Sequence, residues 1–592
     1  MYFSFFKNHY QRKKHDVTLI SLNFTSIFIY WYSVSALLHF YYGTFLTWGG
    51  FYYFLVTRTY TAAIIFYIAS GFIILSLAFT LYFFSRKYHL IKGEPNKLTN
   101  KKLKAFLILL PIAIILAIII IIPKTQATES TPLIETVIYY IKVNSPSFKA
   151  PENFTIPQSE KVLDISTNLE KPNFVFILME SVPAEHLSLY GYERNVSPNI
   201  DAFAEKSIVF NKSYSTASHS DYSQTAFLSA KYTLTNSYRN FFDQDYPKVF
   251  MWDVLKKQNY STAYISSQDD EWANMINYYN KENLDLYDYS LSDREYDYGS
   301  GNARKDYDEE TIERVIDWIN NTNNPFFVYT NLQATHHPYV YPENNSIFTP
   351  DNPSSSTNYF SIAGGDYEKE LNRYDNSIAY VDKQLGKLFD YLEESNLLEN
   401  TIVVISADHG EILERRHGYL RHGFGVYEEE VRNPLIFYIP GQEHQIINNR
   451  VQSIDVIPTI VDITGFEQLE DFQGYPMVKK QNIYLVAQNQ NFKLGIIKDN
   501  IKFMLDAFNN IEVYNLTEDP LEQNNLVKTP KDEITYFEHG YLLNKWYKCQ
   551  INFYENEKWK NGETIRCGRE QEGELDTLGI IWGRLISWVV KN

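Results

Sequence analysis

The chain has 592 residues, which is long enough for more than one domain. Its net charge of −17 argues against a nucleic-acid partner, because binding to phosphate backbones requires a basic surface. The 2 cysteines, Cys549 and Cys567, are too few for a zinc knuckle. They could close one disulfide loop if this part of the chain lies outside the cytoplasm, or they could remain two thiols.

Three segments near the N-terminus contain no Lys, Arg, Asp or Glu. A bilayer core is crossed by ~20 apolar residues, so we predict membrane spans at 17–40, 61–84 and 105–122. A cleavable signal peptide does not fit, because two further spans follow the first. The apolar stretch 45–56 is too short to span and is predicted to be interfacial or re-entrant.

The basic residues around these segments predict the orientation in the membrane. They gather before the first span and between the second and third: Lys7, Arg12, Lys13, Lys14, then Arg86, Lys87, Lys92, Lys97, Lys101, Lys102 and Lys104. Between the first and second spans lies Arg58 alone. We therefore expect a multi-pass protein of the inner or plasma membrane. Everything after Pro123 would then be periplasmic or extracellular.

Four parts are predicted along the chain. Residues 1–123 form the transmembrane region, 124–165 a linker with a short helix at 133–143, 166–530 an α/β domain, and 531–592 a C-terminal extension. In the α/β domain, apolar runs alternate with helical patterns, which is typical of a mostly parallel sheet covered by helices.

The expected strands of this domain are 174–179, 208–210, 261–266, 326–332, 401–406 and 434–439. The expected helices are 202–206, 249–258, 309–320 and 367–395, with a loop entering a further helix near Ser220.

Polar side chains follow three of these strands. Asp408 and His409 follow strand 401–406, Glu180 follows strand 174–179, and His336 comes after strand 326–332. Ligands of open α/β sheets bind just past the carboxyl ends of the strands. Carboxylates and an imidazole there predict a site for one divalent cation. Solvated turns are the alternative for each residue taken alone.

Ser220 is the candidate nucleophile. It is expected at a helix N-terminus, where unpaired backbone N–H groups favour a phosphate or an oxyanion. A metal ion bound to its hydroxyl would lower the pKa of that group further. The alternative is that Ser220 serves only as the N-cap of the helix.

Seven segments, in order along the chain, resemble the alkaline phosphatase superfamily, specifically its sulfatase-like branch. Together they cover roughly residues 171–527. They are 172–181 with its metal acid, 189–201, the nucleophile segment 220–232, the metal-binding turn 407–411 with Ala407 in place of the usual Ser, 427–441, 453–465 and 513–526.

The resemblance implies an extracytoplasmic α/β/α sulfatase-like domain and a set of site residues. One metal ion would be bound by Glu180, Ser220, Asp408 and His409. Zinc is the first choice, with manganese, calcium or magnesium as alternatives. His336 and His422 match positions that contact the substrate phosphate, whereas His337 and His417 are expected to be bystanders.

Two departures from sulfatases concern the nucleophile. Sulfatases convert their Cys or Ser to formylglycine, which requires Pro two positions later and usually Arg four positions later. Here these positions are Tyr222 and Gln224, and the sulfate-binding Gly-Lys-Trp-His motif is missing from 265–272. An unmodified serine can attack phosphorus but cannot form the aldehyde hydrate.

The departures favour the membrane phosphotransferases of the superfamily, such as lipid A phosphoethanolamine transferases and lipoteichoic acid synthases. The expected partners are the membrane, a phospholipid donor and a glycolipid or glycan acceptor in the cell envelope. Those enzymes use Thr as nucleophile and usually have five spans, so Ser220 and the three spans differ from them.

Two other functions stay open. The domain could be a sulfatase, phosphatase or phosphodiesterase that acts on an external ester. It could also be a non-catalytic membrane scaffold, although the presence of all four ligand types argues against a decayed site.

Overall fold

A computed structural model describes residues 160–234, 248–289, 308–351, 367–466, 472–555 and Cys567, with short interruptions. The chain divides into two compact units, 1–144 and 145–592. The predicted spans, the stretch 45–56 and the helix at 133–143 lie outside the described residues. Among the helices that are described, none is both long and apolar enough to cross a membrane.

The larger sheet has nine strands within the described residues, in the order β4-β3-β5-β1-β6-β8-β2-β7, with β9 paired to β2. Strands β4, β3, β5, β1 and β6 run parallel to one another, whereas β8 and β7 are antiparallel to their neighbours. The bounds are β1 Asn173–Met179, β2 Ile208–Tyr214, β3 Ser261–Ser266, β4 Leu286–Asp288, β5 Phe326–Leu332, β6 Thr401–Ala407, β7 Arg432–Asn433, β8 Leu435–Tyr438 and β9 Gln445–Gln452.

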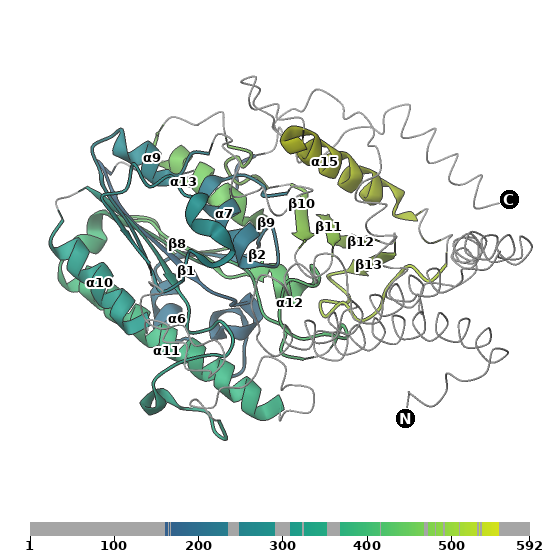
Figure 1. The fold of residues 1–592 in the computed structure, drawn as a ribbon, viewed down its shortest axis with the longest axis horizontal. Helices are drawn as coiled ribbons and strands as arrows, with labels where there is room; N and C mark the ends of the chain where they lie inside the picture. The colour runs from purple at the N-terminus through teal and green to yellow at the C-terminus, as the bar shows by residue number, and fades with distance from the viewer. Residues whose placement is uncertain are drawn as a thin grey trace, which may run out of the picture. The chain divides into compact units, whose positions relative to one another are not determined.

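Helices cover both faces of this sheet, which gives the predicted α/β/α layers. Figure 1 shows α10, α11 and α6 on one side of the strands and α9, α13 and α7 on the other. Strand β1 explains why both faces must be covered. Phe174, Phe176 and Leu178 point into one hydrophobic cluster, while the alternating Val175 and Ile177 point into the other. The bounds are α6 Pro198–Ala204, α7 Ser220–Ser229, α9 Met251–Lys256, α10 Asp308–Asn320, α11 Tyr367–Glu394, α12 Glu428–Val431 and α13 Val456–Ile463.

The predicted elements match the observed ones closely in the centre of the sheet and less well at its margin. The strands 261–266 and 326–332 coincide with β3 and β5. Helix α6 begins earlier than predicted, because Pro198 is in its first turn, where proline is favoured. Strand β2 extends to Tyr214 rather than ending at residue 210.

A second sheet follows the first in the chain and was not predicted. Its four described strands are antiparallel, in the order β10-β11-β12-β13: Ile483–Ala487, Lys493–Lys498, Ile501–Asp506 and Ile511–Asn515. Helix α15, Phe537–Glu555, lies in the predicted C-terminal extension, and its Leu543 and Trp546 pack in the same hydrophobic cluster as the strands.

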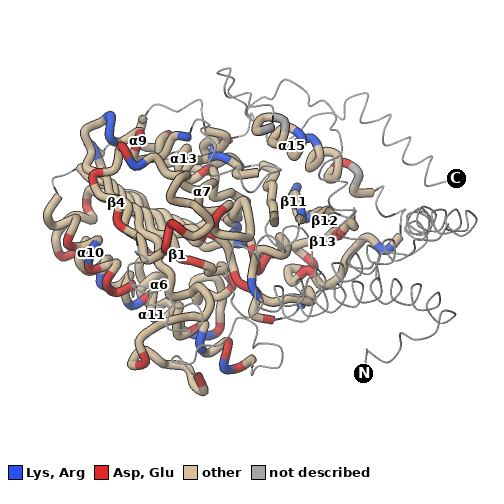
Figure 2. Tube along the Cα trace, in the orientation of Figure 1, with Lys and Arg blue, Asp and Glu red and all other residues tan. Residues whose placement is uncertain are grey.

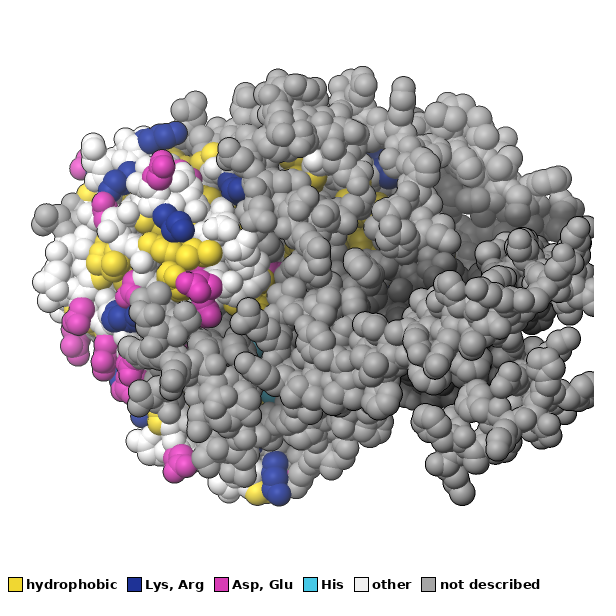
Figure 3. Space-filling model, viewed as in Figure 1, with side chains coloured by type: hydrophobic (Ala, Val, Ile, Leu, Met, Phe, Trp, Pro, Cys, Tyr) yellow, Lys and Arg dark blue, Asp and Glu magenta, His cyan; other side chains and the backbone are white. Residues whose placement is uncertain are grey.

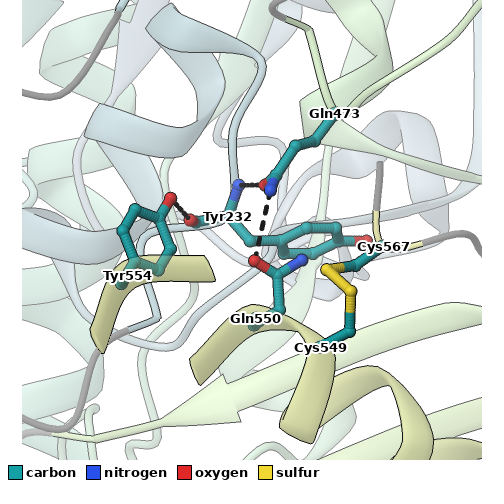
Figure 4. Close-up of a disulfide and its surroundings, with 6 residues drawn as sticks. All are labelled: Tyr232, Gln473, Cys549, Gln550, Tyr554 and Cys567. Carbon is teal, nitrogen blue, oxygen red and sulfur yellow. Dashed lines mark hydrogen bonds between the residues drawn. A yellow bond between two sulfur atoms is a disulfide. The ribbon is translucent and has the colours of Figure 1, made fainter. Parts of the chain in front are cut away.

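The structure pairs Cys549 of α15 with Cys567 in a disulfide, as the first of the two sequence alternatives proposed (Figure 4). In the same region, the Tyr554 hydroxyl donates a hydrogen bond to the backbone oxygen of Tyr232. Gln473 links the backbone N–H of Tyr232 to the side chain of Gln550. Helix α15 is therefore tied to the segment that follows α7.

The described surface offers no extended apolar face. Figure 2 shows acidic and basic residues along α10 and α11, and on the face in Figure 3 the described side chains of each type are mixed. Few large apolar side chains of the described residues are exposed: Ile347, Tyr367, Ile446, Leu521 and Leu526. Scattered exposed apolar residues are normal for a soluble domain surface.

A buried cluster of charges joins the two sheets. Lys502 of β12 is fully buried, and its Nζ lies 3.0 Å from a carboxylate oxygen of Glu428 in α12 and 2.9 Å from one of Glu522. A buried ammonium group is tolerable only when such partners compensate for its lost hydration. The second sheet is thus fixed to the larger one by charge as well as by apolar contact.

We predict that Lys502→Ala destabilises the domain by about 3–5 kcal/mol, because it leaves the buried carboxylate of Glu522 and the half-buried one of Glu428 without their cation. The measurement is the denaturant midpoint of the full-length chain by circular dichroism. Lys479→Ala is the control, since the ion pair of Lys479 with Glu160 is largely exposed and its loss should change little. Equal midpoints for the two variants would contradict the prediction.

Candidate active site

Three predicted metal ligands meet at the carboxyl edge of the larger sheet. Strands β1 and β6 pair in parallel with Met179 opposite Ala407, so the next residues, Glu180 and Asp408, emerge together. One ligand atom each from Glu180, Asp408 and His409 lies within 4.8 Å of the others. All three side chains are buried. The structure thus brings together residues that the sequence separates by more than two hundred positions.

Backbone groups hold Asp408 in a fixed orientation. Its Oδ1 accepts hydrogen bonds from the backbone N–H groups of Ser181, at 2.9 Å, and His409, at 2.8 Å. Its Oδ2 lies on the side of His409, 3.5 Å from Nε2. One oxygen is therefore used to hold the turn, and the other faces the remaining ligands.

Ser220 is the first residue of α7 and lies against the same group. Its Oγ donates to Glu180 Oε1 at 2.7 Å and lies 3.0 Å from His409 Nε2. The N-cap position belongs to His219. The N-cap interpretation of Ser220 is therefore wrong, and its hydroxyl points at the carboxylate and the imidazole.

The orientation of His409 suits metal binding. Its Nδ1 lies 2.8 Å from the backbone oxygen of Gly410, an acceptor, so Nδ1 carries a proton. Nε2 then faces Ser220 and Glu180 and can offer its lone pair to a metal ion when the ring is neutral. A backbone oxygen that fixes the tautomer in this way is a common feature of histidine ligands.

The buried charges of the site favour the binding of a cation. Burial and the charge of Glu180 raise the pKa of Asp408 to about 7. Burial opposes protonation of His409, but Asp408 and Glu180 outweigh it and raise the pKa of the imidazole to about 10. Burial acts to raise the pKa of Glu180 as well, yet His409 holds it well below the usual range. Two buried carboxylates with one imidazole form a donor set that fits a divalent metal.

A second histidine lies beside the metal ligands. The ring of His422 is 4.1 Å from that of His409, and its Nδ1 lies 2.6 Å from Glu411 Oε2. Burial and the neighbouring His409 lower the pKa of His422 to about 4. It is therefore neutral near pH 7, with Nδ1 donating to Glu411. His336 is half-buried, and its ring lies 6.0 Å from that of His422.

The two expected bystanders lie in other surroundings. His337 packs edge-on against Tyr339, with ring centroids 5.4 Å apart. His417 stacks on Tyr427, with centroids 3.6 Å apart.

Several residues contact the site although the sequence analysis gave them no binding role. Gln224 donates to both Glu180 and Asp408, and Gln333 donates to Glu180. His219 lies 5.5 Å from the rings of both His422 and Trp272. Gln224 could have been found, because it is one helical turn after Ser220 and shares its face of α7. Gln333 and Trp272 carry no local sequence signal.

The comparisons with known proteins agree with this architecture. A family model described as Sulfatase matches residues 172–466. The chain belongs to the sulfatase-like branch of the alkaline phosphatase superfamily. This confirms the resemblance stated from the sequence.

Three proteins illustrate what the sulfatase-like domain is similar to. An ulvan-active sulfatase of Formosa agariphila is 22% identical over 51% of this chain and 64% of its own length. The lipoteichoic acid synthase-like protein YvgJ of Bacillus subtilis is 23% identical over 55% of this chain and 53% of its own. The match thus spans less than two thirds of either relative. A phosphonate monoester hydrolase of Agrobacterium radiobacter shares the fold with a TM-score of 0.51, at 15% identity over 64% of this chain and 96% of its own.

We predict that His417 makes the sulfatase-like domain less stable in acid. Burial, helped by Lys493 and Lys502 against the opposing charge of Glu512, lowers its pKa from 6.5 to about 4. Between pH 6.5 and about 4, His417 is protonated in the unfolded chain but neutral in the folded chain. The free energy of unfolding therefore decreases as the pH falls from 6.5 towards 4. The free energy of unfolding should fall more steeply over this range in wild type than in His417→Gln. Parallel curves for the two proteins would contradict the prediction, since both keep the candidate metal site.

Proposed function

We propose that this chain is a membrane-anchored, metal-dependent phosphotransferase. It moves a phospholipid head group, phosphoethanolamine or phosphoglycerol, onto an acceptor of the cell envelope through a phospho-Ser220 intermediate. Zinc is the first choice of metal, and manganese the next.

The observation that carries the proposal is the surroundings of Ser220 at the two positions that formylglycine formation requires. Tyr222, in place of proline, is fully buried in the hydrophobic cluster of the second sheet. Gln224, in place of arginine, binds the carboxylates of Glu180 and Asp408. Tyr222 packs in the core and Gln224 binds carboxylates, so neither position serves a formylglycine motif. This segment therefore supports a serine that stays unmodified.

The chain's own residues would act in two half-reactions. In the first, a bond forms between Ser220 Oγ and phosphorus, the bond from phosphorus to the diacylglycerol oxygen breaks, and the proton of Ser220 ends on that oxygen. In the second, an acceptor hydroxyl or amine forms a bond to phosphorus, the bond between phosphorus and Ser220 Oγ breaks, and the proton of the acceptor ends on Oγ. A metal ion bound by Glu180, Asp408, His409 and Ser220 would lower the pKa of the serine hydroxyl and offset charge on the phosphate.

The remaining residues would position the phosphate. Glu180 Oε1 and His409 Nε2 hold Ser220 Oγ at the start of α7, whose backbone N–H groups favour an anion. His422 keeps Nδ1 on Glu411 and His336 keeps Nδ1 on the backbone oxygen of His337. Each would therefore donate from Nε2 to a phosphate oxygen only as an imidazolium, a form that the charge of the bound phosphate would favour. These roles follow from matching positions in the family.

The predicted spans support a lipid donor, because an anchored enzyme can act on a phospholipid that stays in the bilayer. The disulfide between Cys549 and Cys567 supports an extracytoplasmic domain, since such bonds persist in oxidising compartments. The proposed location is therefore the inner or plasma membrane, with the domain periplasmic or extracellular.

A second candidate is hydrolysis of a sulfate or phosphate ester outside the cell. The relatives favour it, because several are named sulfatases, including an N-acetylglucosamine-6-O-sulfatase of Bacteroides thetaiotaomicron. It requires either a formylglycine at position 220 or water as the acceptor.

We predict that Ser220→Ala abolishes transfer of a labelled head group from phosphatidylethanolamine or phosphatidylglycerol vesicles by the full-length chain. Loss of a covalent nucleophile should lower the rate by about a thousandfold or more. Ser229→Ala, at the far end of α7, is the control and should keep the wild-type rate. Transfer at the wild-type rate by Ser220→Ala would contradict the proposal.

We also predict that mass spectrometry finds residue 220 as unmodified serine in protein purified from its native host. The measurement distinguishes the phosphotransferase from a formylglycine-dependent sulfatase. A formylglycine at this position would support the sulfatase instead.

A further inference from the structure

Gln224 shows an imbalance in its hydrogen bonds. Its Nε2 has two N–H groups but lies within hydrogen-bond distance of three acceptors: Glu180 Oε2 at 2.9 Å, Asp408 Oδ2 at 3.1 Å and Gln268 Oε1 at 2.7 Å. Within the described residues, its Oε1 is buried and has no hydrogen-bond partner. A buried carbonyl oxygen without a partner costs about 1–3 kcal/mol.

The same imbalance continues along a chain of amides. Gln268 Oε1 accepts from Gln224 and, at 2.7 Å, from Asn331 Nδ2, with Gln333 Nε2 at 3.2 Å. Within the described residues, Gln268 Nε2 meets the weak acceptor Met275 Sδ, at 3.3 Å. Asn331 Oδ1 is a second buried oxygen with no partner among the described residues. The N–H groups of Gln224 and Asn331 thus converge on Gln268 Oε1, while the oxygens of Gln224 and Asn331 accept no hydrogen bond from the described residues.

Turning these three amides over corrects the mismatch between N–H groups and acceptors around Gln268. The amide nitrogens of Gln224 and Asn331 then take the places of the two oxygens, and Gln268 Nε2 takes the place that lies 3.2 Å from Gln333 Nε2. Gln268 Nε2 would then donate to Gln224 Oε1 and Asn331 Oδ1, which matches two N–H groups to two acceptors. The two ends of a carboxamide have nearly the same shape, so the reversal needs no repacking. Gln333 keeps its bond to Glu180 in either arrangement.

The reversed arrangement has one requirement. It places Gln224 Oε1, instead of Nε2, at the carboxylates of Glu180 and Asp408, and three oxygens together repel unless a cation lies among them. In the present arrangement, the Nε2 group supplies the positive partial charge that both carboxylates need.

We propose that Gln224 is a ligand of the metal ion held by Glu180, Asp408 and His409, with its carboxamide turned so that Oε1 faces the ion. The inference rests on the metal centre of the proposed function and adds a neutral oxygen to its ligands. With Glu180, Asp408 and Ser220, four of the five donors are oxygens. Such a set favours manganese more than the zinc preferred above.

The test is manganese binding to the full-length chain, purified in detergent and freed of metal with a chelator. Free Mn²⁺ is measured by its electron paramagnetic resonance signal. Gln224→Leu removes both amide atoms and should weaken affinity by about tenfold or more. Gln224→Glu keeps an oxygen but loses the N–H group, and should restore affinity to within about threefold of wild type, or better.

Gln333→Leu is the matched control, because Gln333 also donates to Glu180 but turns no oxygen towards the site in the proposed arrangement. It should weaken Mn²⁺ binding less than Gln224→Leu does. Equal affinities for these two variants would overturn the proposal. So would a Gln224→Glu variant as weak as Gln224→Leu, since the N–H group would then be what matters.

Circular dichroism of the metal-free proteins checks folding, and Gln224→Met is a second variant without an amide if Gln224→Leu unfolds. Visible absorption of bound Co²⁺ provides an independent readout, because it changes when a ligand is lost. Tight, Gln224-dependent binding in a chain that transfers no head group would support this inference while refuting the phosphotransferase.

Discussion

The site depends on the parallel pairing of β1 with β6. This pairing brings Glu180 and Asp408 out side by side at the carboxyl edge of the sheet. Two carboxylates buried this close repel each other, and neither has water to screen it. The surrounding groups reduce this repulsion by placing positive or partly positive charge beside the carboxylates. They are the imidazole of His409, the amides of Gln224 and Gln333, and the backbone N–H groups that bind Asp408.

The second sheet supports Ser220, the proposed nucleophile, rather than the carboxylates. Backbone hydrogen bonds join Val486 of β10 to Thr216 and Ser218, just before Ser220, and Tyr222 packs in the cluster beneath the second sheet. At the far end of the segment, Tyr554 of α15 holds Tyr232. The start of α7 is therefore fixed from two sides. A nucleophile must be held to within a fraction of an ångström to react quickly, which gives the C-terminal part of the chain a function beyond stability.

The central strands were predictable because they are buried on both faces and therefore appear as unbroken apolar runs, as in 326–332 and 401–406. The second sheet was missed because its strands are short and some carry a polar residue within them, as Ile501–Asp506 does at Lys502. Strand β9 was missed for the same reason, since Gln445–Gln452 is mostly polar and lies at a sheet margin.

For the site, a strand end followed by a charged residue was enough to find Glu180, Asp408 and His409. Two amides pair with these carboxylates. Gln224 could have been found from its spacing to Ser220 on α7, whereas no local pattern shows that Gln333 binds a carboxylate rather than faces water. The catalytic roles of Ser220, His336 and His422 stay predictions, because proximity does not demonstrate turnover.

Burial of Ser220 bears on the choice between transfer and hydrolysis. Only 4% of this residue is exposed, and its hydroxyl is enclosed by Glu180, His409 and the first turn of α7. A phosphate ester formed there would lose its phosphoryl group only to a nucleophile that reaches the phosphorus in line. Water reaches such a place at low local concentration, whereas an acceptor with its own binding contacts is held there at high effective concentration. The proposed transfer therefore depends on an acceptor that binds beside Ser220, whereas hydrolysis depends only on access for water.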